Sequence, residues 1–173
     1  LPEKGMGLEI GGFGKEYAVD QVIALAKKFE IADCLVDLGR DVAAWGAPPQ
    51  GPYWVVGVED AREAEAAAFR LAFSGKALAT SGNGRRFREI GGRKFGHIID
   101  PRSGYPIQHN LVSVTVITET CMDADAYATA LTVMGPEQAL EFANRKGLAV
   151  LLVTRENEEF KEYTSTAFKR FEQ

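Results

Sequence analysis

Hydrophobic and polar positions repeat with two different periods along this chain, and the two periods separate its helices from its strands. Apolar residues recur at steps of three and four between residues 18 and 29, which predicts an amphipathic helix directly after the glycine-rich stretch 11–14. Two further helices are expected. Residues 122–134 are rich in helix-forming residues, and residues 136–146 begin with proline and are followed by glycine.

Runs of β-branched and aromatic residues predict the strands, and residues 111–118 (LVSVTVIT) are the clearest of them. A glycine pair at 91–92 predicts a hairpin with arms at 86–90 and 93–99. Other strands are expected at 32–38, 53–58, 69–73, 77–80, 148–153 and 160–164. A proline-rich loop, alanine-rich helical turns and a basic amphipathic end are expected at 47–52, 61–69 and 165–171. Strands in runs with interspersed helices predict an α+β fold with a mostly antiparallel sheet.

Composition limits the classes of protein to consider. With 173 residues, of which 46% are apolar and 25% charged, the chain is expected to form one globular domain over residues 1–173. Its net charge of −4 argues against binding to nucleic acid or to an anionic membrane surface. The two cysteines form neither a disulfide framework nor a metal motif.

No apolar run reaches membrane-spanning length and no signal peptide is visible. The chain opens at Leu1 and enters a structured motif almost at once, so a trimmed N-terminus is expected.

A histidine and an aspartate stand together in residues 94–105 (KFGHIIDPRSGY), where a strand is expected to carry His97 to its end. Pro101 stops the strand because it cannot donate to a sheet, and it restricts Asp100 to extended geometry. Binding and catalytic groups are common at such strand ends. On spacing alone, a neutral histidine packed in a sheet and an aspartate that caps its own turn explain the pattern equally well.

A carboxylate and a hydroxyl, from Asp125 and Thr129, share one face of the helix expected at 122–134 because they stand four residues apart. Such an oxygen pair suits a hard cation such as Mg²⁺, which takes few protein oxygens and leaves room for substrate phosphates. Acidic residues also gather at helix N-termini because of the helix dipole, which accounts for Asp123. Both interpretations of the pair stay open at this point.

Two glycine-containing turns are candidate nucleotide contacts. Residues 11–14 with Lys15 open a helix, where free backbone N–H groups attract anions, although a plain strand-to-helix turn is the simpler interpretation. Residues 80–84 (TSGNG) could surround a ligand with hydroxyl and N–H donors, and they also have the composition of an ordinary hairpin turn.

Four motifs follow one another in order: GGFGKEYAVD (11–20), LATSGN (78–83), GHIIDPRSGYP (96–106) and DADAYATAL (123–131). Together they resemble the ApbE family, the FAD:protein FMN transferases, and the resemblance extends through VDLGRDV (36–42) and GLAVLLV (147–153). It implies an ApbE-like, T-fold-related architecture. It also implies an enzyme that uses Mg²⁺ and transfers FMN from FAD, through a phosphoester bond, to a Thr or Ser of a target protein, releasing AMP.

The resemblance assigns roles to matching positions. It implies a metal site made by Asp125, Thr129 and a backbone carbonyl at Gly12, and it implies His97 as the catalytic base. The residues implied to bind the flavin nucleotide are Lys15, Asp41, Thr80, Ser81, Gly82, His97, Ile99 and Asp100.

The implied acceptor is a flavin-carrying subunit of a redox pump (Na⁺-translocating NADH:quinone oxidoreductase or Rnf type) or another extracytoplasmic flavoprotein. A periplasmic or cell-envelope location is therefore expected, with membrane contact only through an N-terminal anchor preceding this chain.

Three departures from the family pattern stand out. Glu16 follows Lys15 where the motif commonly has glycine, and Arg40 precedes Asp41 where a second glycine is frequent. Family members also carry a further N-terminal region, so residues 1–173 are expected to be the C-terminal major part of a longer fold. Two alternatives to the transferase follow: a Mg²⁺-dependent FAD pyrophosphatase giving FMN and AMP, and a flavin-binding module without catalysis.

Overall fold

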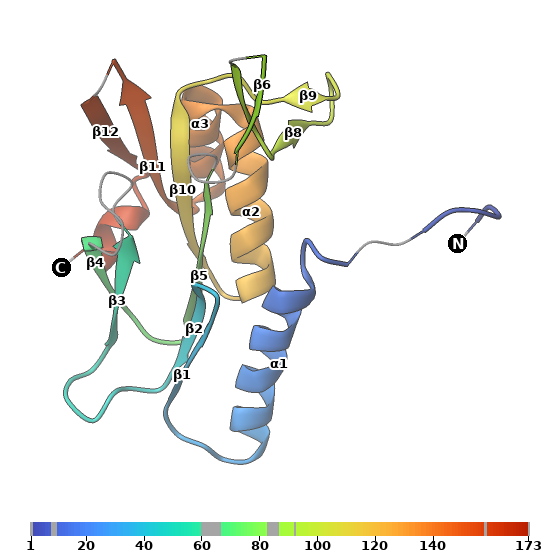
Figure 1. Ribbon diagram of the computed structural model, residues 1–173. Helices are drawn as coiled ribbons and strands as arrows, with labels where there is room; N and C mark the ends of the chain where they lie inside the picture. The colour runs from blue at the N-terminus through green and yellow to red at the C-terminus, as the bar shows by residue number, and fades with distance from the viewer. Residues whose placement is uncertain are drawn as a thin grey trace.

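The centre of the molecule is a six-stranded antiparallel sheet, seen in a computed structural model that describes residues 2–7, 10–59, 67–82, 87–91, 93–157 and 159–172 (Figure 1). In spatial order its strands are β1 (Cys34–Leu38), β2 (Asp41–Trp45), β5 (Lys76–Gly82), β10 (Leu111–Thr118), β11 (Ala149–Glu156) and β12 (Glu159–Thr164). The alternating stretch at 111–118 is confirmed as β10, which lies between β5 and β11.

One face of this sheet is covered by helices (Figure 1). They are α1 (Gly14–Lys28), α2 (Cys121–Met134) and α3 (Pro136–Lys146), all at the positions that the sequence predicts. Val116 of β10 and Leu152 of β11 pack against the α2 and α3 layer, where Leu131 is fully buried. All three helices therefore lie on the same face of the sheet. Helix α1 contacts β2, α2 contacts β5, and the two helices contact each other.

The opposite face is covered by a two-stranded hairpin, β3 (Trp54–Glu59) with β4 (Ala67–Phe73), and by the short 3₁₀ helix η1 (Phe168–Phe171). Leu151 and Val153 of β11 face this second core, while Val150 and Leu152 face the helices. Successive side chains of a strand point to opposite faces, so β11 contributes to both cores at once. The predicted α+β, mostly antiparallel fold is confirmed.

Two small hairpins stand at one end of the molecule, β6 (Phe87–Ile90) with β7 (Arg93–Gly96) and β8 (Ile99–Asp100) with β9 (Tyr105–Pro106). The predicted strand 93–99 is wrong in its second half. It ends at Gly96, and His97 lies in the short connection between β7 and β8. Ile98 beside it is buried, and its carbonyl accepts a hydrogen bond from the N–H of Ile107 at 3.1 Å.

Other differences from the predicted elements have identifiable causes. Strand β2, which begins at Asp41, is not among the strands predicted from the sequence. Gly39 and Arg40 both have positive φ, at +63° and +76°, and make the two-residue turn of the β1–β2 hairpin. The predicted helical turns at 61–69 fall partly outside the described residues, and their last part, residues 67–69, belongs to β4.

The predicted strands on either side of Ser74–Gly75 exist as β4 and β5, but they pair in different sheets. Residues 80–82 of the TSG motif form the end of β5 rather than a turn, and the rest of that predicted turn lies outside the described residues. Within the described part of the chain, no helix has the length and apolar character needed to cross a membrane.

The first turn of α2 is capped from two sides. Thr120 Oγ1 accepts the N–H of Asp123 at 3.1 Å and donates to the Asp123 carboxylate at 2.8 Å. The Asp20 carboxylate of α1 accepts the N–H groups of Cys121 and Met122 at 2.7 and 3.1 Å. These N–H groups have no carbonyl partner inside their own helix, so Asp20 fixes α1 against the start of α2.

Replacing Asp20 with alanine should therefore lower the free energy of unfolding by about 1–2 kcal/mol, the usual cost of losing a helix cap. Urea denaturation followed by circular dichroism measures this change. Gln21→Ala, at an exposed position of the same helix, is the matched control. An Asp20→Ala protein as stable as the Gln21→Ala protein would contradict this role of Asp20.

Candidate functional site

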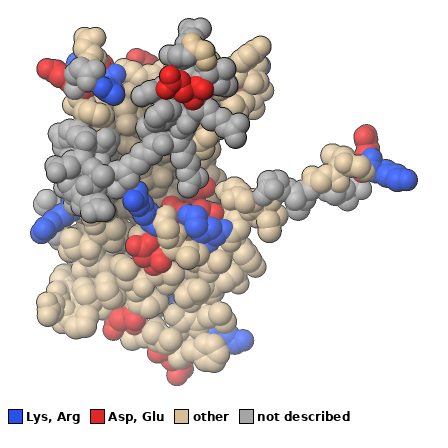
Figure 2. Space-filling model, viewed as in Figure 1, with Lys and Arg blue, Asp and Glu red and all other residues tan. Residues whose placement is uncertain are grey.

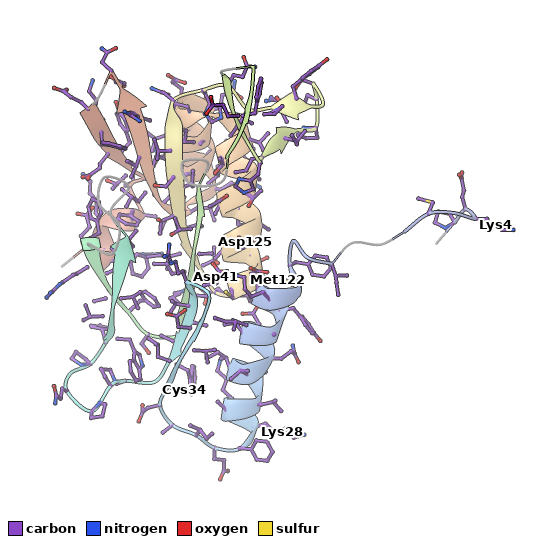
Figure 3. The ribbon with its side chains drawn as sticks, viewed as in Figure 1. Lys4, Lys28, Cys34, Asp41, Met122 and Asp125 are labelled. Carbon is purple, nitrogen blue, oxygen red and sulfur yellow. The ribbon has the colours of Figure 1, made fainter. Side chains whose placement is uncertain are left out.

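Three acidic side chains meet where α1, β2 and α2 come together, and Figure 3 shows Asp41 and Asp125 at this junction. Glu16 is in the first turn of α1, Asp41 is the first residue of β2, and Asp125 is in the second turn of α2. One carboxylate oxygen from each lies within 4.8 Å of the other two. We call these three residues the carboxylate cluster.

Local structure explains how the three residues converge. The positive-φ turn at Gly39 and Arg40 reverses the chain and places Asp41 at the start of β2. Glu16 stands three residues before the fully buried Val19, so both side chains lie on the inward face of α1. The cap made by Asp20 then sets the position of α2, which carries Asp125.

Two members of the cluster are buried and Asp125 is half-buried, and Lys15 compensates only part of their negative charge. Glu16 and Asp41 are 3% and 5% exposed. The ammonium of Lys15 lies 2.9 Å from Glu16 Oε1 and also pairs with the Asp41 carboxylate. Glu16 Oε2 is buried with no hydrogen-bond partner among the described residues. Figure 2 shows acidic and basic side chains lying against one another near the middle of the visible face.

Burial raises the pKa of Asp125, and the nearby negative charge of Glu16 raises it further, whereas Lys15 acts in the opposite direction. The cluster thus has three carboxylates, two of which pair with one ammonium, and among the described residues Glu16 Oε2 has no hydrogen-bond partner. An all-oxygen donor set with excess negative charge fits a hard divalent cation such as Mg²⁺ or Ca²⁺. The residues present therefore fit a divalent metal at this junction.

The three predicted metal ligands, Asp125, Thr129 and Gly12, lie at different distances along the chain from the carboxylate cluster, and only Asp125 is a member of it. Thr129 follows one turn later on α2, and its hydroxyl donates to Ser81 Oγ at 3.3 Å. Gly12 lies in the turn that leads into α1, four residues before Glu16. The assignment of Gly12 and Thr129 as ligands stays a prediction.

The predicted flavin-binding residues of β5 lie beside α2. Ser81 accepts the hydrogen bond from Thr129, and Thr80 Oγ1 lies 2.8 Å from Thr115 Oγ1 of β10. Gly82 comes so close to β10 that an added Cβ would stand 3.2 Å from the carbonyl oxygen of Val112. The end of β5 is thus joined by side-chain contacts to the helix that carries Asp125, while Lys15 and Asp41 belong to the junction itself.

The second group of predicted residues lies on the β8–β9 hairpin and in the connection just before it. His97 and Ile99 are exposed. Asp100 accepts the backbone N–H of Arg102 at 2.9 Å and pairs with its guanidinium at 2.9 Å. The hydrogen bonds from Arg102 hold the pKa of Asp100 below its usual value. Asp100 therefore stabilises its own turn, and its contact with a flavin nucleotide stays a prediction.

The other histidine of the chain, His109, has a structural role. Its Nδ1 accepts the N–H of Leu111 at 3.3 Å, so the proton of the neutral ring is on Nε2. The Nε2–H group donates a hydrogen bond to the carbonyl oxygen of Thr132 at 2.7 Å. The two ring nitrogens of His109 thus join the start of β10 to the end of α2, and the catalytic role of His97 stays a prediction.

Glu16 is the residue of the cluster that sequence reasoning missed, because we treated it only as a departure from a family glycine. A signal was available. Glu16 precedes Val19, Ile23 and Ala26 by three, seven and ten residues, which is the spacing of the buried face of α1. A charged residue at such a position indicates a buried partner or a ligand.

The family model of ApbE matches residues 1–152 of this chain, and the chain belongs to the ApbE family. The FAD:protein FMN transferase of Escherichia coli K12 is 38% identical over 165 residues, which is 95% of this chain and 47% of that protein. The corresponding protein of Vibrio cholerae is 33% identical over 172 residues, covering 99% of this chain and 51% of the relative. This chain spans about half the length of the curated relatives it matches.

Solved structures agree with the fold. The apo form of the flavinyl transferase ApbE from Pseudomonas stutzeri superposes with a TM-score of 0.82 at 35% identity, over 95% of this chain and 51% of that one. The ApbE protein of Thermotoga maritima gives 0.84 at 32% identity, over 98% and 55%. The resemblance drawn from the four motifs is confirmed at the level of family and fold.

The burial of Cys121 gives a direct chemical prediction. Desolvation, followed by the nearby charges of Asp20 and Glu16, raises the pKa of the Cys121 thiol to about 12. At pH 8 only about one Cys121 in ten thousand is then a reactive thiolate. Iodoacetamide at pH 8, followed by peptide mass spectrometry, should modify the half-buried Cys34 and leave Cys121 unmodified. Labelling of Cys121 as fast as Cys34 would contradict its burial.

Proposed function

We propose that this protein transfers FMN from FAD to a Thr or Ser hydroxyl of a target flavoprotein and releases AMP. The observation that carries the proposal is the carboxylate cluster at Asp125, next to a TSG strand end that is hydrogen-bonded to Thr129. The curated relatives named FAD:protein FMN transferase cover almost the whole of this chain, which supports the same chemistry here.

The proposed reaction is a displacement at the phosphorus atom of the FMN half of FAD. The acceptor hydroxyl oxygen forms a new bond to that phosphorus, and the bond from the phosphorus to the bridging oxygen breaks. AMP departs with the bridging oxygen, and the hydroxyl proton goes to a base. A bound Mg²⁺ supplies positive charge that neutralises the diphosphate.

The residues of this chain then have distinct tasks. Asp125 holds the cation, with the Thr129 hydroxyl and the Gly12 carbonyl as its further predicted ligands. The nucleotide is bound by the predicted residues of the junction, the end of β5 and the β8–β9 hairpin. His97 takes the proton, and its exposure supports this role because a base that serves a protein acceptor must be reachable from outside.

The acceptor and the compartment are part of the same proposal and rest on the family resemblance. A flavin-carrying subunit of a redox pump, or another extracytoplasmic flavoprotein, is the proposed acceptor. The periplasm or the cell envelope is the proposed location.

His97→Ala should reduce FMN transfer by about 10²–10⁴-fold, the usual contribution of a general base, and should leave FAD binding intact. Mass spectrometry of the acceptor measures transfer, and fluorescence quenching of FAD measures binding. Gln108→Ala, an exposed change close to the same hairpin, is the control. Transfer at the wild-type rate by His97→Ala would contradict the assignment.

One incubation separates the proposed transferase from the two alternatives. The protein is mixed with FAD, Mg²⁺ and a protein that carries a Ser/Thr flavinylation motif, and both target mass and free nucleotides are measured. A target that gains one FMN supports the transferase. Free FMN and AMP without a modified target indicate a pyrophosphatase, and intact FAD that stays bound indicates a binding module.

Asp125→Ala should abolish both the activity and its dependence on Mg²⁺, because the substitution removes the predicted carboxylate ligand of the cation. Loss of a metal ligand is expected to lower metal affinity by more than about 100-fold. A titration of activity against Mg²⁺ concentration measures the effect. Asp123→Asn, at an exposed position one half-turn earlier, is the control. An Asp125→Ala protein that Mg²⁺ still stimulates would contradict this ligand.

A further inference from the structure

Glu16 is a buried acidic residue with one carboxylate oxygen unpaired among the described residues. It is 3% exposed, although it occupies the first turn of a helix whose outer face is open to solvent. Its Oε1 pairs with Lys15, but its Oε2 is buried without a hydrogen-bond partner among the described residues. A buried carboxylate oxygen without a partner is unfavourable, so a bound group is expected to pair with Glu16 Oε2.

The surroundings of Glu16 identify the chemistry of that group. Asp41 and Asp125 each offer an oxygen within 4.8 Å, and the ammonium of Lys15 pairs with Glu16 and Asp41. With all three carboxylates ionised, the group of four side chains has an excess of two negative charges. A divalent cation neutralises this excess, and carboxylate oxygens are the donors that Mg²⁺ and Ca²⁺ prefer.

The spacing of the oxygens suits a single ion. Oxygens on opposite sides of one Mg²⁺ lie about 4.2 Å apart, and those on opposite sides of one Ca²⁺ lie about 5 Å apart. The separations within the cluster are at most 4.8 Å, so no two of its oxygens lie farther apart than ligands on opposite sides of one Ca²⁺. Two of the three residues are on rigid elements that the Asp20 cap holds together, so only small side-chain movements are needed.

We propose that Glu16 and Asp41 join Asp125 to form a divalent-cation site that is filled before any nucleotide binds. This inference rests on the proposed function and deepens it, since it concerns the same junction. A site with one carboxylate needs the phosphates of a nucleotide to neutralise a bound divalent cation. A site with three carboxylates neutralises the cation by itself. Glu16, which replaces a family glycine, is therefore the residue that allows the cation to bind in the absence of a nucleotide.

Lys15 has a specific part in this arrangement. Its side chain is 39% exposed and flexible, and its ammonium pairs with two of the three carboxylates. A cation bound to the same oxygens competes with that ammonium and releases it towards solvent. Lys15 then becomes available for the phosphates of FAD, so loading the cation prepares the protein for the nucleotide.

The test is a calorimetric titration of the metal-stripped, nucleotide-free protein with MgCl₂ and separately with CaCl₂. We expect one divalent cation per chain. Glu16→Gln and Asp41→Asn should each weaken the binding at least tenfold, because each removes one charged ligand without changing its shape. Lys15→Met should tighten it, because the competing charge is gone. Glu137→Gln, an exposed change in the first turn of α3, should bind the cation like the wild type.

Thermal unfolding supplies a second readout that does not depend on activity. A cation that binds only the folded protein raises its melting temperature, so added MgCl₂ should stabilise the wild type and Glu137→Gln but not Glu16→Gln. Uptake of the cation by Glu16→Gln with wild-type affinity would overturn the inference, and so would an absence of uptake by the nucleotide-free wild type.

The inference and the proposed function can fail separately. A protein that takes up Mg²⁺ only after FAD is added, yet transfers FMN, overturns the resident cation and leaves the transferase in place. A protein that binds Mg²⁺ alone but neither cleaves FAD nor modifies a target supports the cation site and overturns the transferase.

Discussion

The contact on which the site depends is the pair of hydrogen bonds from the start of α2 to Asp20 of α1. Two helix N–H groups that have no carbonyl partner in their own helix are satisfied by one carboxylate that is 101 residues away along the chain. The contact sets how far the first turn of α1 lies from the second turn of α2. The carboxylates of Glu16 and Asp125 come close to each other because of this contact, and β2 places Asp41 beside them.

Much of the fold follows from the sequence because local patterns and tertiary packing agree there. The periodic apolar residues of α1, the proline and glycine around α3, and the alternation in β10 each predict the observed element. The failures occur where packing overrides local preference. Strand β2 has the weak composition DVAAW and exists because it pairs with β1 and β5, and residues 67–69 are alanine-rich but pair with β3.

The candidate site was predictable in its parts but not in its arrangement. Asp125, Asp41 and Lys15 were identified from motifs, and the structure brings all three together. Sequence spacing could not show that Glu16 completes the group, because that depends on which face of α1 is buried. The frequent family glycine at position 40 has a physical reason as well, since Arg40 adopts a φ of +76° that favours glycine.

Strand β11 has a consequence for how this protein can change in evolution. Its residues 150–153 alternate between the helix-covered core and the hairpin-covered core, and all four are buried. The Ser165 hydroxyl holds its beginning in place, between the N–H of Val150 and the carbonyl of Leu148. A hydrophobic residue there can be exchanged for another with modest effect, whereas a single inserted or deleted residue exchanges the two cores. The length of β11 is therefore under tighter constraint than its composition, and substitutions rather than insertions are the variation it can accept.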